Sequence, residues 1–105
     1  MWMIFEDTIY PANEDPVTKK EVMVEQLSTR AVCLDQVKGM VVWPLGGPSW
    51  AIDVKLEGDA GFLICKGMTR NNAENLLRDI VRAITSGRHQ WLEIRRTDEG
   101  GFGVF

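Results

Sequence analysis

Residues 50–87 read WAIDVKLEGDAGFLICKGMTRNNAENLLRDIVRAITSG, and this stretch decides the fold. From Trp50 to Glu57 apolar residues alternate with polar or small ones, a pattern typical of a half-buried strand. The turn residues 58–61 lead into a second apolar run over 62–65. We therefore expect a β-hairpin at the start of this stretch.

From Thr69 the spacing of the apolar residues changes to that of a helix. Thr69, or Asn71 with Glu74 three residues later, can cap the N-terminus of this helix. Gly87 suits the position just after its C-terminus. The sequence predicts one long helix over about 69–86. One apolar stripe is expected to be buried along it, made of Ala73, Leu76, Leu77, Ile80, Val81 and Ile84.

Short apolar segments on both sides of this stretch predict further strands. Residues 28–30 are interpreted as a bend, and residues 11–16 and 44–48 as a loop and a turn. Strands so short and so close in sequence favour antiparallel pairing. We predict one α+β domain over residues 1–105, in which one long helix packs on a curved antiparallel sheet or partial barrel of five to eight strands. The strands outside the hairpin are expected at 2–9, 22–27, 31–34, 40–43, 90–95 and 102–105.

Length and charge limit the classes of function. A chain of 105 residues suffices for one domain with a small core, and 45% hydrophobic with 26% charged residues is an ordinary globular composition. The formal net charge of −3 argues against a general binder of duplex DNA and is too small for a mimic of nucleic acid. A local basic patch is still compatible with this charge.

The sequence also predicts where the protein works. No apolar run approaches the roughly 20 residues of a membrane-spanning helix. Residues 1–7 lack the basic start and the long apolar core of a signal peptide. Cys33 and Cys65 fall in apolar strand-like runs, so we interpret both as buried free thiols. We expect a cytoplasmic protein with no membrane partner.

The succession of these patterns resembles a known group of proteins. It is similar to small bacterial and phage proteins in which a β-meander, sometimes described as a pleckstrin-homology-like half-barrel, is followed by one helix across the sheet. The resemblance covers roughly residues 31–86 and consists of hydrophobic pattern and turn placement. It implies a fold and carries over no functional residue, because most members have no established activity. The segments that carry it are 31–37, 50–56, 62–65 and 69–84.

The residue types that catalysis or metal binding requires are scarce. His89 is the only histidine and lies between Arg88 and Gln90 in a polar turn, where a solvated side chain is expected. One histidine and two distant cysteines make neither a zinc site nor an iron site. The glycine pairs 46–47 and 100–101 do not stand between a strand and a helix, as a phosphate-binding loop would. We predict that the protein is not an enzyme and uses no cofactor or metal.

The strand after the helix carries the residues best suited to binding. A strand over 90–95 that buries Leu92 and Ile94 turns Trp91 and Arg95 outward together. Tryptophan and arginine are enriched where binding energy concentrates. The competing interpretation is that the N-terminal strand or the C-terminal tail covers Trp91, and that Arg95 is an ordinary solvated charge. The predicted partner-binding residues are Arg88, Trp91, Arg95 and Arg96.

Two smaller predictions concern pairs of side chains. Trp43 and Trp50 flank the turn over 44–48 and are expected to pack across the hairpin as an aromatic pair, with stacking on a ligand as the alternative. Glu74 and Arg78 have the spacing of an ion pair on the solvated face of the helix.

We expect a non-catalytic protein-interaction module of bacterial or phage type. Its partner is an unidentified protein, and self-association through an edge strand is a further assembly to test. One alternative is a nucleic-acid-associated regulator that uses the Arg and Trp residues named above. The other is a small-molecule sensor or enzyme with a site inside the curved sheet. Nucleic-acid binding weakens steeply with salt, which separates the first alternative from an apolar protein contact.

Overall fold

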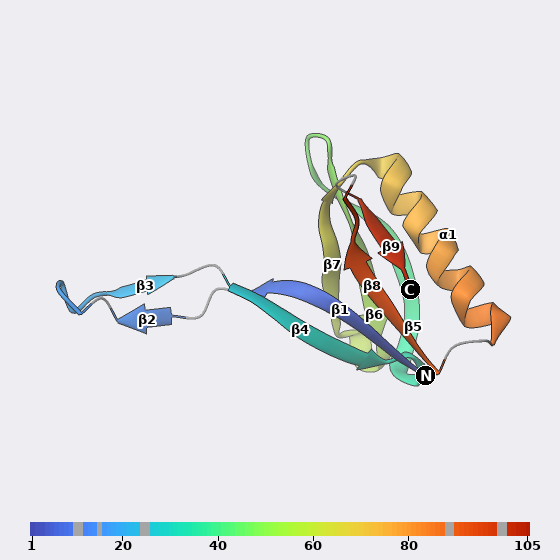
Figure 1. Cartoon of the computed structure of the whole chain (residues 1–105), viewed down its shortest axis with the longest axis horizontal. Coiled ribbons are helices and arrows are strands. Elements are labelled where there is room, and N and C mark those ends of the chain that lie inside the picture. Colours follow the sequence, from blue (N-terminus) through green and yellow to red (C-terminus); the bar gives the residue numbers. More distant parts are fainter. Residues whose placement is uncertain (10–11, 15, 24–25, 88–89, 99–100) are drawn as a thin grey trace.

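The computed structural model describes residues 1–9, 12–14, 16–23, 26–87, 90–98 and 101–105. Over these residues the chain forms nine strands, two short 3₁₀ helices and one long α-helix (Figure 1). The strands are β1 (Trp2–Ile9), β2 (Ala12–Glu14), β3 (Glu21–Met23), β4 (Gln26–Cys33), β5 (Val37–Gly46), β6 (Ser49–Leu56), β7 (Gly61–Met68), β8 (Trp91–Arg96) and β9 (Phe102–Val104). The helices are η1 (Leu34–Gln36), η2 (Glu57–Asp59) and α1 (Arg70–Ser86).

Seven of these strands form two open sheets. The first has the order β4-β1-β8-β9 and the second the order β5-β6-β7. The predicted α+β fold, with one long helix packed on a curved sheet, is confirmed, with the strands divided between two sheets that do not close into a barrel. The expectation of antiparallel pairing holds for every neighbouring pair in these two sheets except β1 and β8, which run parallel. The reason is that α1 returns the chain to the end of the sheet at which β1 begins, so β8 starts beside it (Figure 1).

The core is formed by the inward residues of both sheets and of α1. Phe5 of β1 stacks on Phe62 of β7 with 5.5 Å between ring centroids, which joins the two sheets. Burying each aliphatic or aromatic side chain of this kind contributes roughly 1.5–3 kcal/mol to folding. The largest fully buried side chains are Phe5, Met3, Ile52, Ile64, Leu76, Ile80, Leu92 and Val54.

Helix α1 begins and ends where the sequence predicts. Of the two proposed caps the structure selects Thr69, whose Oγ accepts a hydrogen bond from the Asn72 N–H at 3.2 Å. Gly87 follows the helix with φ of 64°, a left-handed conformation that glycine adopts without steric cost.

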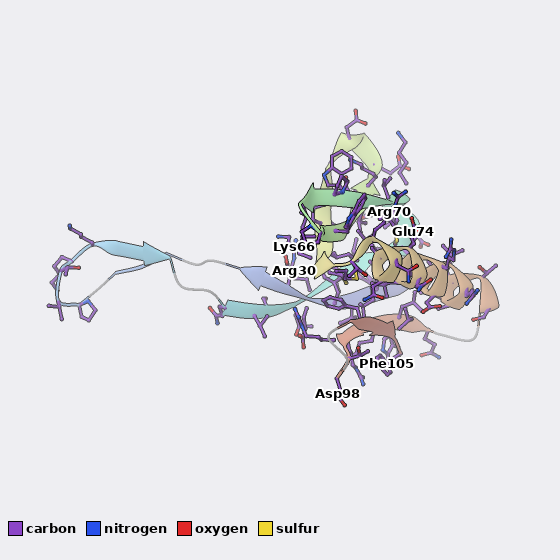
Figure 2. The ribbon with its side chains drawn as sticks, turned by 90° about the horizontal axis from the view of Figure 1, so that it is seen from above. Arg30, Lys66, Arg70, Glu74, Asp98 and Phe105 are labelled. Carbon is purple, nitrogen blue, oxygen red and sulfur yellow. The ribbon has the colours of Figure 1, made fainter. Side chains whose placement is uncertain are left out.

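The predicted ion pair between Glu74 and Arg78 is wrong. Glu74 accepts a hydrogen bond from Arg70 at 3.1 Å instead, and Figure 2 shows these two side chains together at the start of α1. The Arg70 guanidinium also lies 5.2 Å from the centre of the Trp50 ring, which holds it in place for this pairing. Arg78 donates to Asn75 at 3.4 Å.

The buried stripe of α1 is narrower than the apolar stripe in its sequence. Ala73, Leu76 and Ile80 are buried, whereas Val81 and Ile84 are 54% and 40% exposed. The helix lies along one side of the two sheets and packs against β5 and β6 on one flank and β9 on the other (Figure 1). Strands on these two flanks cover its central residues and leave part of the stripe in water.

Three predicted turns differ in the structure. β4 is continuous through residues 28–30 because each of them pairs with β1, so no bend forms there. Residues 12–14 form β2 and pair with β3 rather than forming a loop. β5 continues through Pro44 to Gly46, which shortens the turn to 47–48. Proline is accepted at this position because β5 is an edge strand.

The predicted packing of Trp43 on Trp50 is also wrong. The register pairs Trp43 with Ala51 and Trp50 with Pro44, so the two rings belong to adjacent positions that face opposite sides of the sheet. Trp43 instead lies under the Lys55 ammonium at 5.7 Å. β6, predicted as a half-buried strand, is buried on both faces at its centre, where Asp53 is 8% exposed and paired with Lys55 at 2.7 Å.

A two-stranded ribbon of β2 and β3 projects from the sheets on the side opposite α1 (Figure 1). It makes the molecule elongated, with extents of 53 × 29 × 29 Å. At its tip, residues 16–20 are exposed. No helix among the described residues has the length and apolar character needed to cross a lipid bilayer.

Candidate functional site

The two faces of β8 have opposite environments. Leu92 and Ile94 are 0% and 2% exposed and belong to the core, whereas Trp91 is 52% exposed. The predicted division of this strand into an inward and an outward face is therefore confirmed. Because side chains alternate along a strand, Glu93 and Arg95 share the outward face with Trp91.

A second tryptophan lies beside Trp91. The parallel register of β1 and β8 places Trp2 directly opposite Trp91, and Trp2 is 53% exposed. The N-terminal strand therefore does not cover Trp91, as the competing interpretation supposed, but adds a second exposed ring on the same face. We call the outward side chains Trp2, Trp91, Glu93, Arg95 and Phe105 the aromatic face.

Phe105 joins this face through the backbone of the tail. Its N–H donates to the Glu93 carbonyl at 2.8 Å, and the Glu93 N–H donates to the Phe105 carbonyl at 3.1 Å, so the ladder continues beyond β9. The ring is 55% exposed and lies on the side of β8 and β9 that faces away from α1 (Figure 2). It rests over Gly103, where a Cβ would lie 3.3 Å from the ring.

The charges on the aromatic face are paired with each other. The Arg95 guanidinium donates to a Glu93 carboxylate oxygen at 2.8 Å and lies 5.1 Å from the centre of the Phe105 ring. This hydrogen bond lowers the pKa of Glu93 and raises the pKa of Arg95. An exposed pair contributes little to stability, but it neutralises the charge beside the rings.

The structure does not bring the predicted arginines together. Arg96 follows Arg95 in β8 and faces the opposite side of the sheet, with its guanidinium 5.0 Å from the centre of the Phe102 ring. There it borders a narrow cavity of about 50 Å³ with Cys65 and Lys66. Arg88 and His89 lie outside the described residues. Of the four predicted residues, the aromatic face contains Trp91 and Arg95.

Both cysteines are unpaired, as predicted, but their surroundings differ. Burial raises the pKa of the Cys65 thiol to about 12, an effect that the positive charge of Arg96 partly offsets. A thiol with so high a pKa is a poor nucleophile at neutral pH. The prediction that Cys33 is buried is wrong: it is only half-buried, because it lies in the edge strand β4, opposite Trp2.

Two open hollows lie beside α1 among the described residues. One, of about 520 Å³, is polar and lies between α1 and β9, where Asn72, Asn75 and Asp79 border it. Another, of about 380 Å³, is apolar and lies between α1 and β5. No group of three or more His, Cys, Asp and Glu side chains is arranged to hold a metal ion among the described residues.

Sequence reasoning missed Trp2 and Phe105. One signal for Trp2 was present, because Met3 and Phe5 at alternate positions are apolar enough to face a core and thereby turn Trp2 outward. The pairing of β1 with β8 was not visible, since it joins residues at opposite ends of the chain. Comparison with protein-family models, curated proteins and solved structures finds no match. The site is therefore defined by its geometry and not by transfer from a relative.

Proposed function

We propose that the protein is a non-catalytic interaction module that binds another protein through the aromatic face. The observation that carries this proposal is the pairing of Trp2 with Trp91 on neighbouring strands, each more than half exposed. Contiguous apolar surface on a folded protein is generally small unless it serves binding. Tryptophan contributes large, stiff contact area and is among the residues that most often dominate binding energy.

The charges of the face indicate the chemistry of the partner. Arg95 and Glu93 satisfy each other, and the Phe105 ring covers one side of the guanidinium. A strongly acidic or basic partner would gain little from this pair. We therefore propose a partner with a flat, largely uncharged apolar patch, rimmed by groups that can hydrogen-bond to Glu93 or Arg95.

The nucleic-acid alternative has less support. It requires Arg95 and Arg96 to act on one surface with Trp91, and these two arginines face opposite sides of the sheet. The alternative of a site inside the curved sheet is not favoured, because apolar side chains such as Phe5, Ile52 and Leu92 fill the interior. Neither alternative has a specific observation in its favour.

Compartment, source and assembly complete the proposal. We propose a protein of bacterial or phage type that works in the cytoplasm. The compartment is supported by the two cysteines, which are unpaired in the fold, as is usual where thiols are kept reduced. Self-association through an edge strand is compatible with two open sheets, whose end strands are β4, β9, β5 and β7. Sedimentation velocity over a range of concentrations tests this assembly.

The test is affinity capture with matched variants. We expect Trp91→Ala with Arg95→Ala to stay folded and to lose the captured partner, because both side chains contribute to the same face. Trp43→Ala is the control, since Trp43 is 46% exposed on the second sheet. The captured protein is identified by mass spectrometry and rebound in purified form.

The outcomes separate the alternatives. A partner retained by the folded double variant, or lost equally by Trp43→Ala, would remove the aromatic face as the binding site. If a captured nucleic acid is released steeply with rising salt, the regulator alternative replaces the protein-binding proposal. Circular dichroism of each variant establishes that loss of binding is not loss of the fold.

A further inference from the structure

A different surface, on the second sheet, has the properties of a peptide-binding edge. β5 is the end strand of the order β5-β6-β7, so it has a strand neighbour on one side only. Alternate residues of such a strand direct N–H and C=O groups away from the sheet, where another extended chain can pair with them. Pro44 has no N–H, and a β-bulge interrupts the register between Val37 and Gly39, so the edge available for full pairing runs from Gly39 to Trp43.

Gly39 begins this edge, directly after the β-bulge between Val37 and Gly39. Its φ is not in the left-handed region, and a Cβ built on it would meet no atom within 4 Å. Glycine in a strand often marks a bulge or a place where another backbone approaches closely, and here the absence of a side chain leaves the first position of the edge open. Gly39 therefore leaves room for the backbone of a ligand to approach the edge of β5.

An apolar groove of about 380 Å³ runs between this edge and α1. On the helix side it is bordered by Leu77, Val81 and Ile84, of which the last two are the apolar residues that α1 leaves exposed. Leu34, Val37 and Met40 border the other side. A strand added to β5 would turn every second side chain toward α1 and into this groove.

We propose that the β5 edge and this groove bind an extended peptide segment of a partner protein, with uncharged apolar residues at alternate positions. The backbone of the segment pairs with β5, and its apolar side chains fill the groove against Val81 and Ile84. None of the side chains that border the groove is charged, so a charged side chain inserted there would lose its hydration without a counter-ion. This surface is separate from the aromatic face, so the inference does not rest on the function proposed above.

The size of the edge favours a peptide over a second copy of the chain. The five residues Gly39–Trp43 of β5 are available, which corresponds to a length of roughly 17 Å. A strand of that length covers on the order of 200 Å², whereas each partner of a stable dimer buries about 800 Å². A short segment needs no further contact area to be recognised, because main-chain hydrogen bonds supply affinity and the groove supplies selectivity.

The test selects eight-residue peptides from a phage-displayed random library on the purified chain. We expect the selected sequences to carry apolar residues at alternate positions. The tightest peptide, labelled with fluorescein, is then titrated by anisotropy. Val81→Ser should raise its Kd about tenfold, since the lost contact is that of one apolar side chain.

The matched control is Val17→Ser. Val17 is 87% exposed and lies at the tip of the ribbon of β2 and β3, outside both the β5 edge and the groove. This variant should change the Kd less than twofold. Hydrogen exchange gives an independent measure, because strand addition should slow the exchange of amide protons in Gly39–Trp43.

Three results would overturn the proposal. The first is a selection without alternating apolar residues. The second is a bound peptide whose Kd is raised equally by Val81→Ser and Val17→Ser, or that protects no β5 amide. The third is a dimer of the free protein, seen by sedimentation, that Val81→Ser dissociates, because the groove would then be covered by a second copy. Loss of binding by the Trp91→Ala variant alone bears on the aromatic face and not on this groove.

Discussion

Trp91 and Leu92 are neighbours in β8, yet one is 52% exposed and the other is completely buried. The same contrast occurs in α1, where Ile80 is completely buried and Val81 is 54% exposed. In each pair both residues are large and apolar, so hydrophobicity alone does not separate them. What separates them is whether another layer of the fold covers their side. The inward residues hold the fold together, and the outward ones are available for binding.

The largest expected effect of burial is on the reactivity of Cys65, which is a buried side chain. Its pKa of about 12 lowers the thiolate fraction at pH 8 about a thousandfold relative to an ordinary thiol. We expect Cys65 in a Cys33→Ala variant to react with iodoacetamide at least that much more slowly in the folded protein than in denaturant. Mass spectrometry measures the rate of labelling. Fast labelling of the folded variant would show that β7 opens readily around Cys65.

The next effect is on stability and compares the two faces directly. Leu92→Ala and Ile80→Ala should each lower the free energy of unfolding by about 2–5 kcal/mol, because both remove a completely buried side chain. Trp91→Ala should lower it by about 1 kcal/mol or less, since much of its ring is already in water. Urea unfolding of the three variants measures these differences.

Leu77 and Glu74 sharpen this comparison within α1. Leu77 is half-buried at the border of the groove between α1 and β5. The loss in free energy of unfolding caused by Leu77→Ala should therefore lie between the losses caused by Ile80→Ala and Trp91→Ala. Glu74→Ala, which removes an exposed ion pair with Arg70, should change stability by a few tenths of a kcal/mol. If Leu77→Ala lowers the free energy of unfolding as much as Ile80→Ala does, the groove between α1 and β5 is closed rather than open.

The smallest effect concerns the charge pair on the aromatic face and its dependence on pH. The hydrogen bond from Arg95 lowers the pKa of Glu93 in the folded protein below its usual value of 4.5. The stabilisation is therefore fully present above that value and is lost as the pH falls through the lower folded-state pKa. We expect Glu93→Gln to lower the Tm slightly at pH 7 and to have no effect well below pH 4.

Scanning calorimetry over this pH range measures the difference. Arg95→Gln is the control, because it removes the partner that shifts the pKa of Glu93. The effects of the two single substitutions on the Tm should not be additive in the double variant. A Tm difference that persists unchanged into acid would mean that Glu93 acts through packing and not through its charge.

Local features of the fold were predicted because short-range physics determines them. Thr69 and Gly87 mark the ends of α1 through hydrogen bonding and backbone freedom that involve only nearby residues. The alternation of Leu92 and Ile94 with Trp91 identifies the two faces of β8 for the same reason, because side chains in any strand point to opposite sides in turn. These predictions needed no knowledge of which strands are neighbours.

Only the tertiary structure decided which exposed side chains lie together. Trp2 lies opposite Trp91 because the chain returns through α1 and places β8 beside β1, a pairing across almost the whole sequence. Arg95 and Arg96, adjacent in sequence, are separated because they face opposite sides of the sheet. Val81 stays exposed because β5 and β9 cover α1 only from two sides. Sequence periodicity therefore determined which elements form and which way their side chains alternate, whereas the packing of distant strands determined which apolar residues became core and which remained at the surface.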